Sequence, residues 1–460
     1  MEAQVLSWCN RLIRCRSVTG EGTRAIAEMC ALELLAPLGI EARLVPSAHE
    51  GSAQVNLVAT IKGRDSAATP VVLNTHLDTV PPGDNILWTE CGGDPFAPTI
   101  RGDRIYGLGA ADTKLDFVAK VMALAARGTP RRDVHLVGTF GEEHGLVGAK
   151  EVVAAGLLPR NALAYVGEPS RLQVITAHKG LMVFELTAWF EPQRFEQQSA
   201  ATTRLVFDGR SAHSSTPSLG RNAICLALAA LETNPQIRVA SISGGDAVNK
   251  VPARCEAIIS GEFDRGMDAT RAEGLDGVAL DFIPPPAIEA LAIFVANLQK
   301  FADHAAVPEP DYAQPTLTSN PGVIKSRADS LTLQFELRPS PALPLETVRR
   351  GVGEVAEEIS RKIPQVKLKL AELRANPGFR SALDGEAVEL AMAALARAGL
   401  PLESGVKAGC TEAGVYSAAG LRPVVFGPGP STGVIHAPNE YNFLADVAGA
   451  INFYRELLQL

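Results

Sequence analysis

The residues best able to do chemistry in this sequence are histidines and carboxylates that follow short apolar segments. Residues 71–74 form such a segment and run into His76 and Asp78. Side chains two residues apart on an extended chain face the same way, so both would project from one edge of a sheet. An imidazole that binds a metal and a carboxylate that orients it suit this arrangement. Taken alone, the pair also describes an exposed loop.

Three more acids follow in the next segments. Asp112 stands in a glycine-rich loop before a predicted helix and, taken alone, is best interpreted as a helix-start residue near the positive end of the helix dipole. Residues 134–140 predict a strand that runs into Glu142 and Glu143. Two adjacent acids can point in different directions, one toward a metal and one toward the attacking water. A solvated turn is the alternative.

The last two candidates complete a pattern. Glu168 follows a predicted strand at residues 164–166, and His436 follows an apolar segment near the C-terminus. Successive predicted strands or their loops therefore end in His, Asp or Glu, which chance does not readily produce. A set of two histidines and three or four carboxylates fits a paired site for hard-to-borderline divalent ions better than a structural zinc cluster.

Cysteine plays no part in this pattern. The seven cysteines are scattered and form no CxxC pair, which argues against a disulfide framework and against a thiolate zinc site. Any metal in this protein must therefore be held by histidine and carboxylate.

The elements that must position these residues alternate between helix and strand. Helical periodicity opens the chain between residues 5 and 35. Predicted strands and helices then interleave at residues 54–61, 71–74, 117–126, 134–139, 149–155 and 164–166. This order is typical of an α/β sheet covered by helices on both faces.

The pattern changes near residue 176. Alternating strands at 181–189 and 203–207, with helices at 223–232 and 287–303, predict a separate α+β unit. After a loop that starts at Pro339, helix and strand alternate again to the C-terminus. We therefore expect one α/β domain built from residues 1–175 and 341–460, with a second domain, 176–340, inserted into it.

Composition narrows the function classes. The chain has 460 residues, which is too long for one compact core and favours two domains. It carries 43 basic and 51 acidic residues, a net charge of −8, with no basic block for a phosphate backbone, so we expect no nucleic-acid partner. Neither a membrane-spanning run nor a signal peptide is evident, so we expect a cytoplasmic protein with no membrane partner.

Five segments carry a resemblance to a known family: NTHLDTVP, YGLGAADTK, GTFGEEHG, VGEPS and IHAPNEY, in this order. The sequence resembles the M20 metallopeptidase family, which includes acetylornithine deacetylase, succinyl-diaminopimelate desuccinylase, aminoacylases, glutamate carboxypeptidases and dipeptidases of the peptidase V type. The resemblance implies a di-zinc catalytic α/β/α domain with an inserted α+β lid or dimerisation domain.

The resemblance also implies a role for each candidate. It implies that His76 and Glu168 bind one zinc ion, that Glu143 and His436 bind the other, and that Asp112 bridges the two. Co²⁺ or Mn²⁺ could substitute for zinc.

Two more residues of the catalytic domain receive roles from the same resemblance. Glu142 becomes the general base and Asp78 the carboxylate that orients His76. A pair of ions sharing a carboxylate and a water lowers the pKa of that water toward ~7, which agrees with these roles.

Three residues of the inserted domain match family positions near the substrate. His213, in GRSAHSSTP, would help to stabilise the oxyanion, often from a partner subunit, which implies a homodimer. Asn249 would lie near the substrate, and Arg338 would hold the substrate carboxylate. A strand-end arginine paired with a surface acid is the alternative for Arg338.

The chain departs from the family pattern at two places. Where relatives usually have Met-Lys-Gly-Gly after the bridging aspartate, this chain has Thr113-Lys114-Leu115-Asp116, which we expect to alter the substrate fit. The inserted domain is also long and partly similar to the enlarged lid of peptidase V-type dipeptidases, so a monomer stays possible.

The leading hypothesis is a zinc-dependent hydrolase that cleaves the amide bond of an N-acyl amino acid or a C-terminal amino acid amide. A dipeptidase of the peptidase V kind, acting on a short peptide, is the alternative with the same chemistry. A metal-free, non-catalytic binding protein on the same fold is the alternative from a different class.

Overall fold

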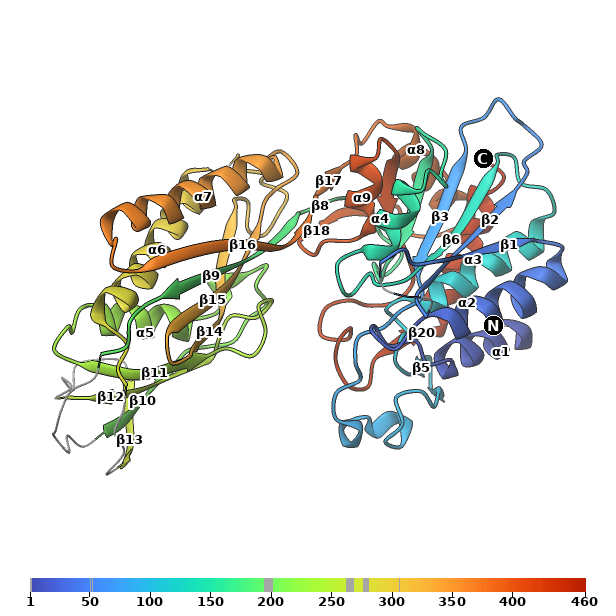
Figure 1. Cartoon of the computed structure of the whole chain (residues 1–460). Helices are drawn as coiled ribbons and strands as arrows, with labels where there is room; N and C mark the ends of the chain where they lie inside the picture. Colours follow the sequence, from blue (N-terminus) through green and yellow to red (C-terminus); the bar gives the residue numbers. More distant parts are fainter. Residues whose placement is uncertain are drawn as a thin grey trace. The chain divides into compact units, whose positions relative to one another are not determined.

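The chain divides into two compact units in the computed structural model, which describes residues 2–49, 51, 53–193, 202–261, 269–275, 281–305 and 307–460. Met1–His178 and Asn376–Leu460 together form one unit, here called the split unit, and Lys179–Ala375 form the other, here called the inserted unit. Figure 1 shows the elements of both.

A nine-stranded sheet forms the centre of the described part of the split unit. Its strands lie in the order β1 (Ala42–Pro46), β2 (Val55–Ile61), β6 (Val134–Thr139), β3 (Val71–His76), β7 (Leu163–Gly167), β19 (Arg422–Val425), β8 (Val174–His178) and β17 (Phe379–Arg380), with β18 (Ser404–Lys407) also paired to β8. Strands β6, β3, β7 and β19 are mutually parallel. Their carboxyl ends therefore share one edge of the sheet.

Helices cover both faces of this sheet, because side chains on a strand alternate between two apolar cores. Leu73 and Leu136 point into one core and Val72 and Val137 into the other. The first core is covered by α1 (Ala3–Arg14), α2 (Arg24–Met29), α3 (Lys114–Arg127), α8 (Glu386–Ala398) and α10 (Leu444–Leu457), and the second by α4 (Val147–Ala154) and α9 (Glu412–Ala418). The predicted α/β/α architecture is confirmed.

A small sheet brings the C-terminal segment next to the glycine-rich loop. Its strands are β4 (Thr99–Arg101), β5 (Arg104–Tyr106) and β20 (Tyr441–Phe443). Tyr441 pairs with Tyr106, so residues just before Tyr441 lie beside residues just after Tyr106.

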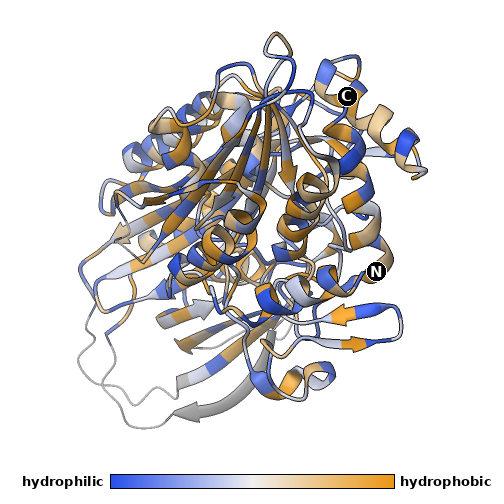
Figure 2. Ribbon diagram, turned by 90° about the vertical axis from the view of Figure 1, so that its right-hand side faces the viewer, coloured by the Kyte–Doolittle hydropathy of each residue, from blue (hydrophilic) through white to orange (hydrophobic). Residues whose placement is uncertain are grey.

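The inserted unit is an antiparallel sheet with helices packed on it. The sheet order is β13 (Ala269–Leu275), β10 (Thr202–Asp208), β12 (Arg254–Ser260), β11 (Arg238–Gly244), β14 (Thr318–Ser326), β15 (Ser330–Arg338), β9 (Leu181–Trp189) and β16 (Lys367–Asn376). Helices α5 (Ala223–Glu232), α6 (Pro285–His304) and α7 (Leu345–Lys362) share its apolar core. In Figure 2 the apolar residues gather on strands and helices, whereas the connecting loops are mostly hydrophilic.

The unit boundaries differ from the predicted ones. They lie at 178/179 and 375/376 rather than at 175/176 and 340/341. Residues 341–375 stay with the inserted unit because α7 buries Val348, Val352 and Ile359 in its core and because β16 completes its sheet. The chain was predicted to return to the first domain at residue 341, and this boundary was therefore placed too early.

Among the described residues, no helix is both long enough and apolar enough to cross a membrane.

Candidate metal centre

The carboxyl edge of the parallel strands gathers the predicted ligands of the split unit. His76 is the last residue of β3, Glu142 and Glu143 follow β6, and Glu168 follows β7. The register places His76 opposite Thr139 and Thr75 opposite Gly167, so the three strands end at the same level. This edge is where α/β sheets bind their ligands.

Two overlapping groups of these side chains have the dimensions of a metal site. One group is His76, Glu142 and Glu168, and the other is His76, Asp112 and Glu143. In each group the ligand atoms lie within 4.8 Å of one another. His76 belongs to both, so the two groups form one continuous cluster.

Asp112 lies between the two histidines. Its Oδ1 is 3.1 Å from His76 Nε2, and its Oδ2 is 3.2 Å from His436 Nε2. His436 Nε2 is also 3.1 Å from Glu143 Oε2. One carboxylate therefore contacts both imidazoles, with a different oxygen for each.

The loop that carries His436 is fixed to the glycine-rich loop by Glu440. Its Oε1 accepts hydrogen bonds from the backbone N–H groups of Ala111, at 2.8 Å, and Asp112, at 3.0 Å. His436 itself has φ +57°, an uncommon conformation for a residue other than glycine. Burial, followed by the field of Asp112, raises the pKa of Glu440 to about 8.

Asp78 acts on the cluster through its backbone and its side chain separately. The nearest Asp78 atom to His76 Nδ1 is the backbone oxygen, at 3.0 Å, whereas the carboxylate is 3.6 Å away. A carbonyl oxygen can only accept, so Nδ1 donates to it, and Nε2 is the ring nitrogen that faces Asp112 and would bind a metal ion.

The Asp78 carboxylate holds the neighbouring turn. It accepts from the backbone N–H groups of Glu142 and Glu143, at 3.2 and 3.4 Å, and from Thr19 Oγ1 at 2.7 Å. Asp78 was predicted to orient His76 by its carboxylate. In the structure its backbone oxygen is the closer contact, and the carboxylate positions the two glutamates.

The cluster concentrates negative charge away from water. Burial raises the pKa of Glu142 well above its usual range, and the neighbouring Glu168 carboxylate adds to this. Burial and Asp112 likewise raise the pKa of Glu143. Burial lowers the pKa of His436, but hydrogen bonds to Asp112 and Glu143 outweigh it and raise the value to about 11. The carboxylates and His76 are buried, whereas the His436 side chain is 43% exposed. Carboxylates and imidazoles without thiolates are the donor set that suits Zn²⁺, Co²⁺ or Mn²⁺.

Lys407 and Glu412 belong to this region, and neither was among the predicted site residues. Lys407, at the end of β18, places its Nζ 3.0 Å from Glu168 Oε2. Glu412 accepts a hydrogen bond from Thr139 Oγ1 at 2.9 Å, and burial raises its pKa to about 7. Lys407 ends a strand as three of the ligands follow one, but this strand has only four residues and is too short to show a period in the sequence.

The departure at Leu115-Asp116 lies in the interior of the split unit. Leu115 is part of the apolar core. The Asp116 carboxylate accepts from Thr75 Oγ1 at 2.6 Å and Tyr454 OH at 2.7 Å, and it pairs with Lys120 Nζ at 2.6 Å. Asp116 was expected to alter the substrate fit, but both of its carboxylate oxygens are engaged in these buried contacts.

The three predicted substrate residues of the inserted unit are neighbours. His213 pairs with Lys250, and the N–H of Ser214 donates to the backbone oxygen of Asn249 at 3.1 Å. Ser214 Oγ is also 3.3 Å from Arg338 Nη2. One short stretch therefore connects His213, Asn249 and Arg338.

The Arg338 guanidinium is engaged inside the inserted unit. Its Nε donates to Glu336 Oε1, and the side chains of Arg338 and Glu336 are only 5% and 1% exposed. Ser214 Oγ donates to the same Glu336 oxygen at 2.7 Å. Arg338 is thus paired with an acid, as the alternative interpretation held, but this acid is buried.

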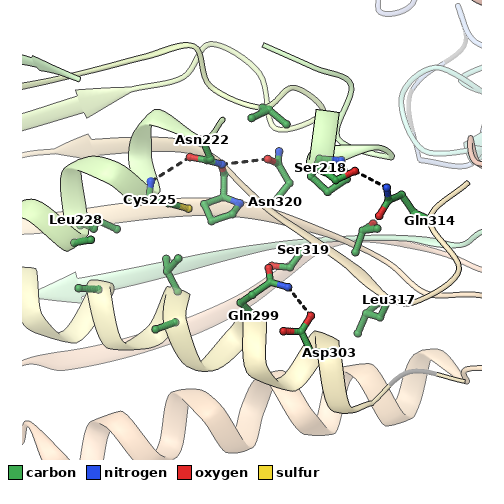
Figure 3. Close-up of a pocket in the computed structure, with 18 of the residues that line it drawn as sticks. Ser218, Asn222, Cys225, Leu228, Gln299, Asp303, Gln314, Leu317, Ser319 and Asn320 are labelled. Atoms are coloured by element: carbon green, nitrogen blue, oxygen red, sulfur yellow. Dashed lines mark hydrogen bonds between the residues drawn. The ribbon is translucent and has the colours of Figure 1, made fainter. Parts of the chain in front are cut away.

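A cavity of about 560 Å³ lies elsewhere in the inserted unit. Figure 3 shows Asn222, Cys225 and Leu228 of the α5 region on one side of the cavity, with Gln299 and Asp303 of α6 and Leu317 on the other. None of the predicted site residues lines this cavity.

Comparison with known proteins agrees with the geometry. Residues 72–460 match the peptidase family M20/M25/M40. The acetylornithine deacetylase of Photorhabdus laumondii is 33% identical over 244 residues, which are 48% of this chain and 56% of that protein. The acetylornithine deacetylase of Myxococcus xanthus is 26% identical over 85% of this chain and 80% of that protein. Matches to the first relatives thus span 56 to 61% of their length.

Solved structures share the fold across almost the whole chain. The aminoacylhistidine dipeptidase of Vibrio alginolyticus has a TM-score of 0.70 at 17% identity and covers 99% of this chain and 96% of its own. A dinuclear metal-binding peptidase of the M20 family from Bacillus subtilis has a TM-score of 0.55 at 14% identity and covers 99% and 96%.

Proposed function

Because the chain belongs to the peptidase family M20/M25/M40, we propose that it is a metal-dependent hydrolase that cleaves the amide bond of an N-acyl amino acid. The observation that carries this proposal is the Asp112 carboxylate, which contacts His76 with one oxygen and His436 with the other. The names of the curated relatives favour deacylation over dipeptide cleavage.

The proposed ligands divide into two sets around Asp112. His76 and Glu168 would hold one ion, and Glu143 and His436 would hold the other. We propose two Zn²⁺ ions per chain, with Co²⁺ or Mn²⁺ able to replace them. Such a pair supplies a Lewis acid for the scissile carbonyl and lowers the pKa of the attacking water.

Glu142 is the proposed general base. The Asp78 carboxylate holds its backbone N–H, so the side chain starts from a fixed turn beside Glu168 and His76. The Glu142 carboxylate takes the proton of the attacking water and returns a proton to the leaving amine. A raised pKa suits both steps, because the group must accept a proton and then release it.

The inserted unit supplies the proposed substrate contacts. His213 would stabilise the developing oxyanion, and Asn249 and Arg338 would contact the substrate. The hydrogen bonds through Ser214 support a shared role for these three residues. We propose a homodimer in which His213 acts across the interface. A cytoplasmic location stays a prediction.

The test is metal analysis combined with amine release. The purified chain is loaded with Zn²⁺, its zinc content is measured, and amine release is followed for matched panels of N-acyl amino acids and dipeptides. We expect close to two zinc ions per chain and faster release from N-acyl amino acids.

The panel has two informative alternatives. Faster release from dipeptides would support the dipeptidase. No release from either panel would refute hydrolysis, and no bound zinc after loading would favour the metal-free, non-catalytic binding protein.

A further inference from the structure

Lys407 is the cation that the structure adds to the proposed ligand cluster. It ends β18, opposite His178 of β8 in the parallel pair, and so comes from a part of the chain far from the ligands in sequence. Its Nζ lies 3.0 Å from Glu168 Oε2. The lysine therefore faces a carboxylate that the proposed function assigns to a metal ion.

The Lys407 side chain is partly exposed. It is 20% exposed, whereas the side chains of His76, Asp112 and Glu168 are 1%, 7% and 7% exposed. An ammonium has three N–H donors, and Glu168 uses one of them. A substrate group can therefore reach this side chain.

The charge balance of the filled site calls for an anion near Lys407. A metal ion on Glu168 would take up the charge of the carboxylate that Lys407 faces. The Lys407 ammonium would then lack a counter-charge of its own. An anionic group of the substrate beside Lys407 restores the balance.

Arg338 is a poorer candidate for this anion. Its guanidinium already shares a buried hydrogen-bonded pair with Glu336, which compensates its charge within the inserted unit. Lys407 lies in the same unit as the ligands, and its partner carboxylate is one that the proposed function gives to a metal.

We propose that Lys407 is a substrate-binding residue whose ammonium contacts a carboxylate of the substrate. The proposal rests on the proposed function, because it presumes that metal ions occupy the cluster. It assigns the substrate class as amides that carry a carboxylate near the scissile bond. That carboxylate belongs either to the amino acid or to a dicarboxylic acyl group.

Calorimetry on the zinc-loaded chain tests the contact without relying on turnover. The chain carries Glu142→Gln to prevent hydrolysis during the titration. The first pair of ligands is N-acetyl-L-ornithine and its α-carboxamide. The second pair, N-succinyl- and N-butyryl-L-ornithine α-carboxamide, places the carboxylate on the acyl side instead.

Lys407→Met is the test variant, and Lys62→Met is the matched control. Lys62 also pairs with an acid, Asp133, but its side chain is 81% exposed and its acid is not one of the proposed metal ligands. We expect the carboxylate ligand of one pair to bind roughly 10- to 100-fold more tightly than its neutral partner. Lys407→Met should abolish that preference, Lys62→Met should keep it, and Lys407→Arg should restore part of it.

Three results would overturn the proposal. The parent chain could show no preference within either pair, or Lys407→Met could keep the preference. The variant could also lose zinc by elemental analysis, which would make Lys407 a positioning residue for Glu168. Failure of the proposed function looks different: the chain with Glu142 intact would release no amine, while the binding preference and its loss in Lys407→Met would still be measured.

Discussion

Replacing Asp116 with asparagine should strongly destabilise the split unit. Asp116 and Lys120 are both fully buried, and their charged atoms are 2.6 Å apart. Asparagine keeps the shape but has one acceptor oxygen, so it can accept from Thr75 or from Tyr454 but not from both. It also leaves the Lys120 ammonium buried without a counter-charge. Breaking a buried pair in this way costs about 3–5 kcal/mol.

The expected loss of stability can be measured as a lower melting temperature. A change of 1 kcal/mol shifts the Tm of a domain of this class by about 2–4 °C, so Asp116→Asn should lower the transition of the split unit by about 6–20 °C. Differential scanning calorimetry measures it, since two units can give two transitions.

The double variant Asp116→Asn with Lys120→Met separates charge from packing. Removing both charges is often close to neutral, so this variant should recover most of the lost stability. If Asp116→Asn melted within about 2 °C of the parent, or if the double variant melted no higher than the single one, the reasoning would be wrong.

Four further outcomes are expected. Glu142→Gln should keep both metals by elemental analysis but lose about 10²–10⁴-fold in kcat; near-normal kcat would remove Glu142 as the base. Asp112→Ala should weaken both ions together in a chelator titration, whereas loss of one ion alone would contradict the bridging role. Burial, assisted by Arg338, lowers the pKa of Lys179 to about 8, so between pH 8 and about 10.4 the unfolded chain binds the extra proton and stability should rise with pH. Urea titrations of Lys179→Met should show a smaller rise of stability with pH than the parent, and an identical slope would contradict the prediction. Mixing inactive Glu142→Gln and His213→Ala chains under exchange should restore part of the activity if His213 acts across a dimer, and no restoration would count against the dimeric site.

The positions of His76, Glu143 and Glu168 could be predicted because each lies at or just after the end of an apolar strand. Val71–His76, Val134–Thr139 and Leu163–Gly167 read as buried strands, and parallel strands place the residues at their ends at one edge. The sequence pattern thus predicts that these three side chains lie close together.

Lys407 and Glu440 could not be found in the same way. Their contacts depend on β18 and β20, which have four and three residues and are too short to show a period. Their partners, Glu168 and Asp112, are also hundreds of residues away in the chain. Local pattern does not specify such pairings.

The predicted boundary at residue 341 and the expected effect of Asp116 on the substrate fit were wrong for a related reason. The periodicity of Leu345–Lys362 predicts an amphipathic helix but not the core on which it packs. Asp116 reads as a polar helix-start residue, and only the position of Lys120 and Tyr454 shows that its charge is buried.

The split unit has a consequence for the order in which the protein folds during synthesis. The inserted unit is continuous, so all of Lys179–Ala375 is synthesised before the second half of the split unit. The N-terminal half meanwhile lacks β19, the neighbour of β7, and α10, which packs on α3. Until those elements are made, the N-terminal half exposes an unpaired strand edge and an uncovered apolar helix face, which are the features that chaperones bind. His436 is the last predicted ligand to be synthesised, so the metal cluster is completed only when most of the chain already exists.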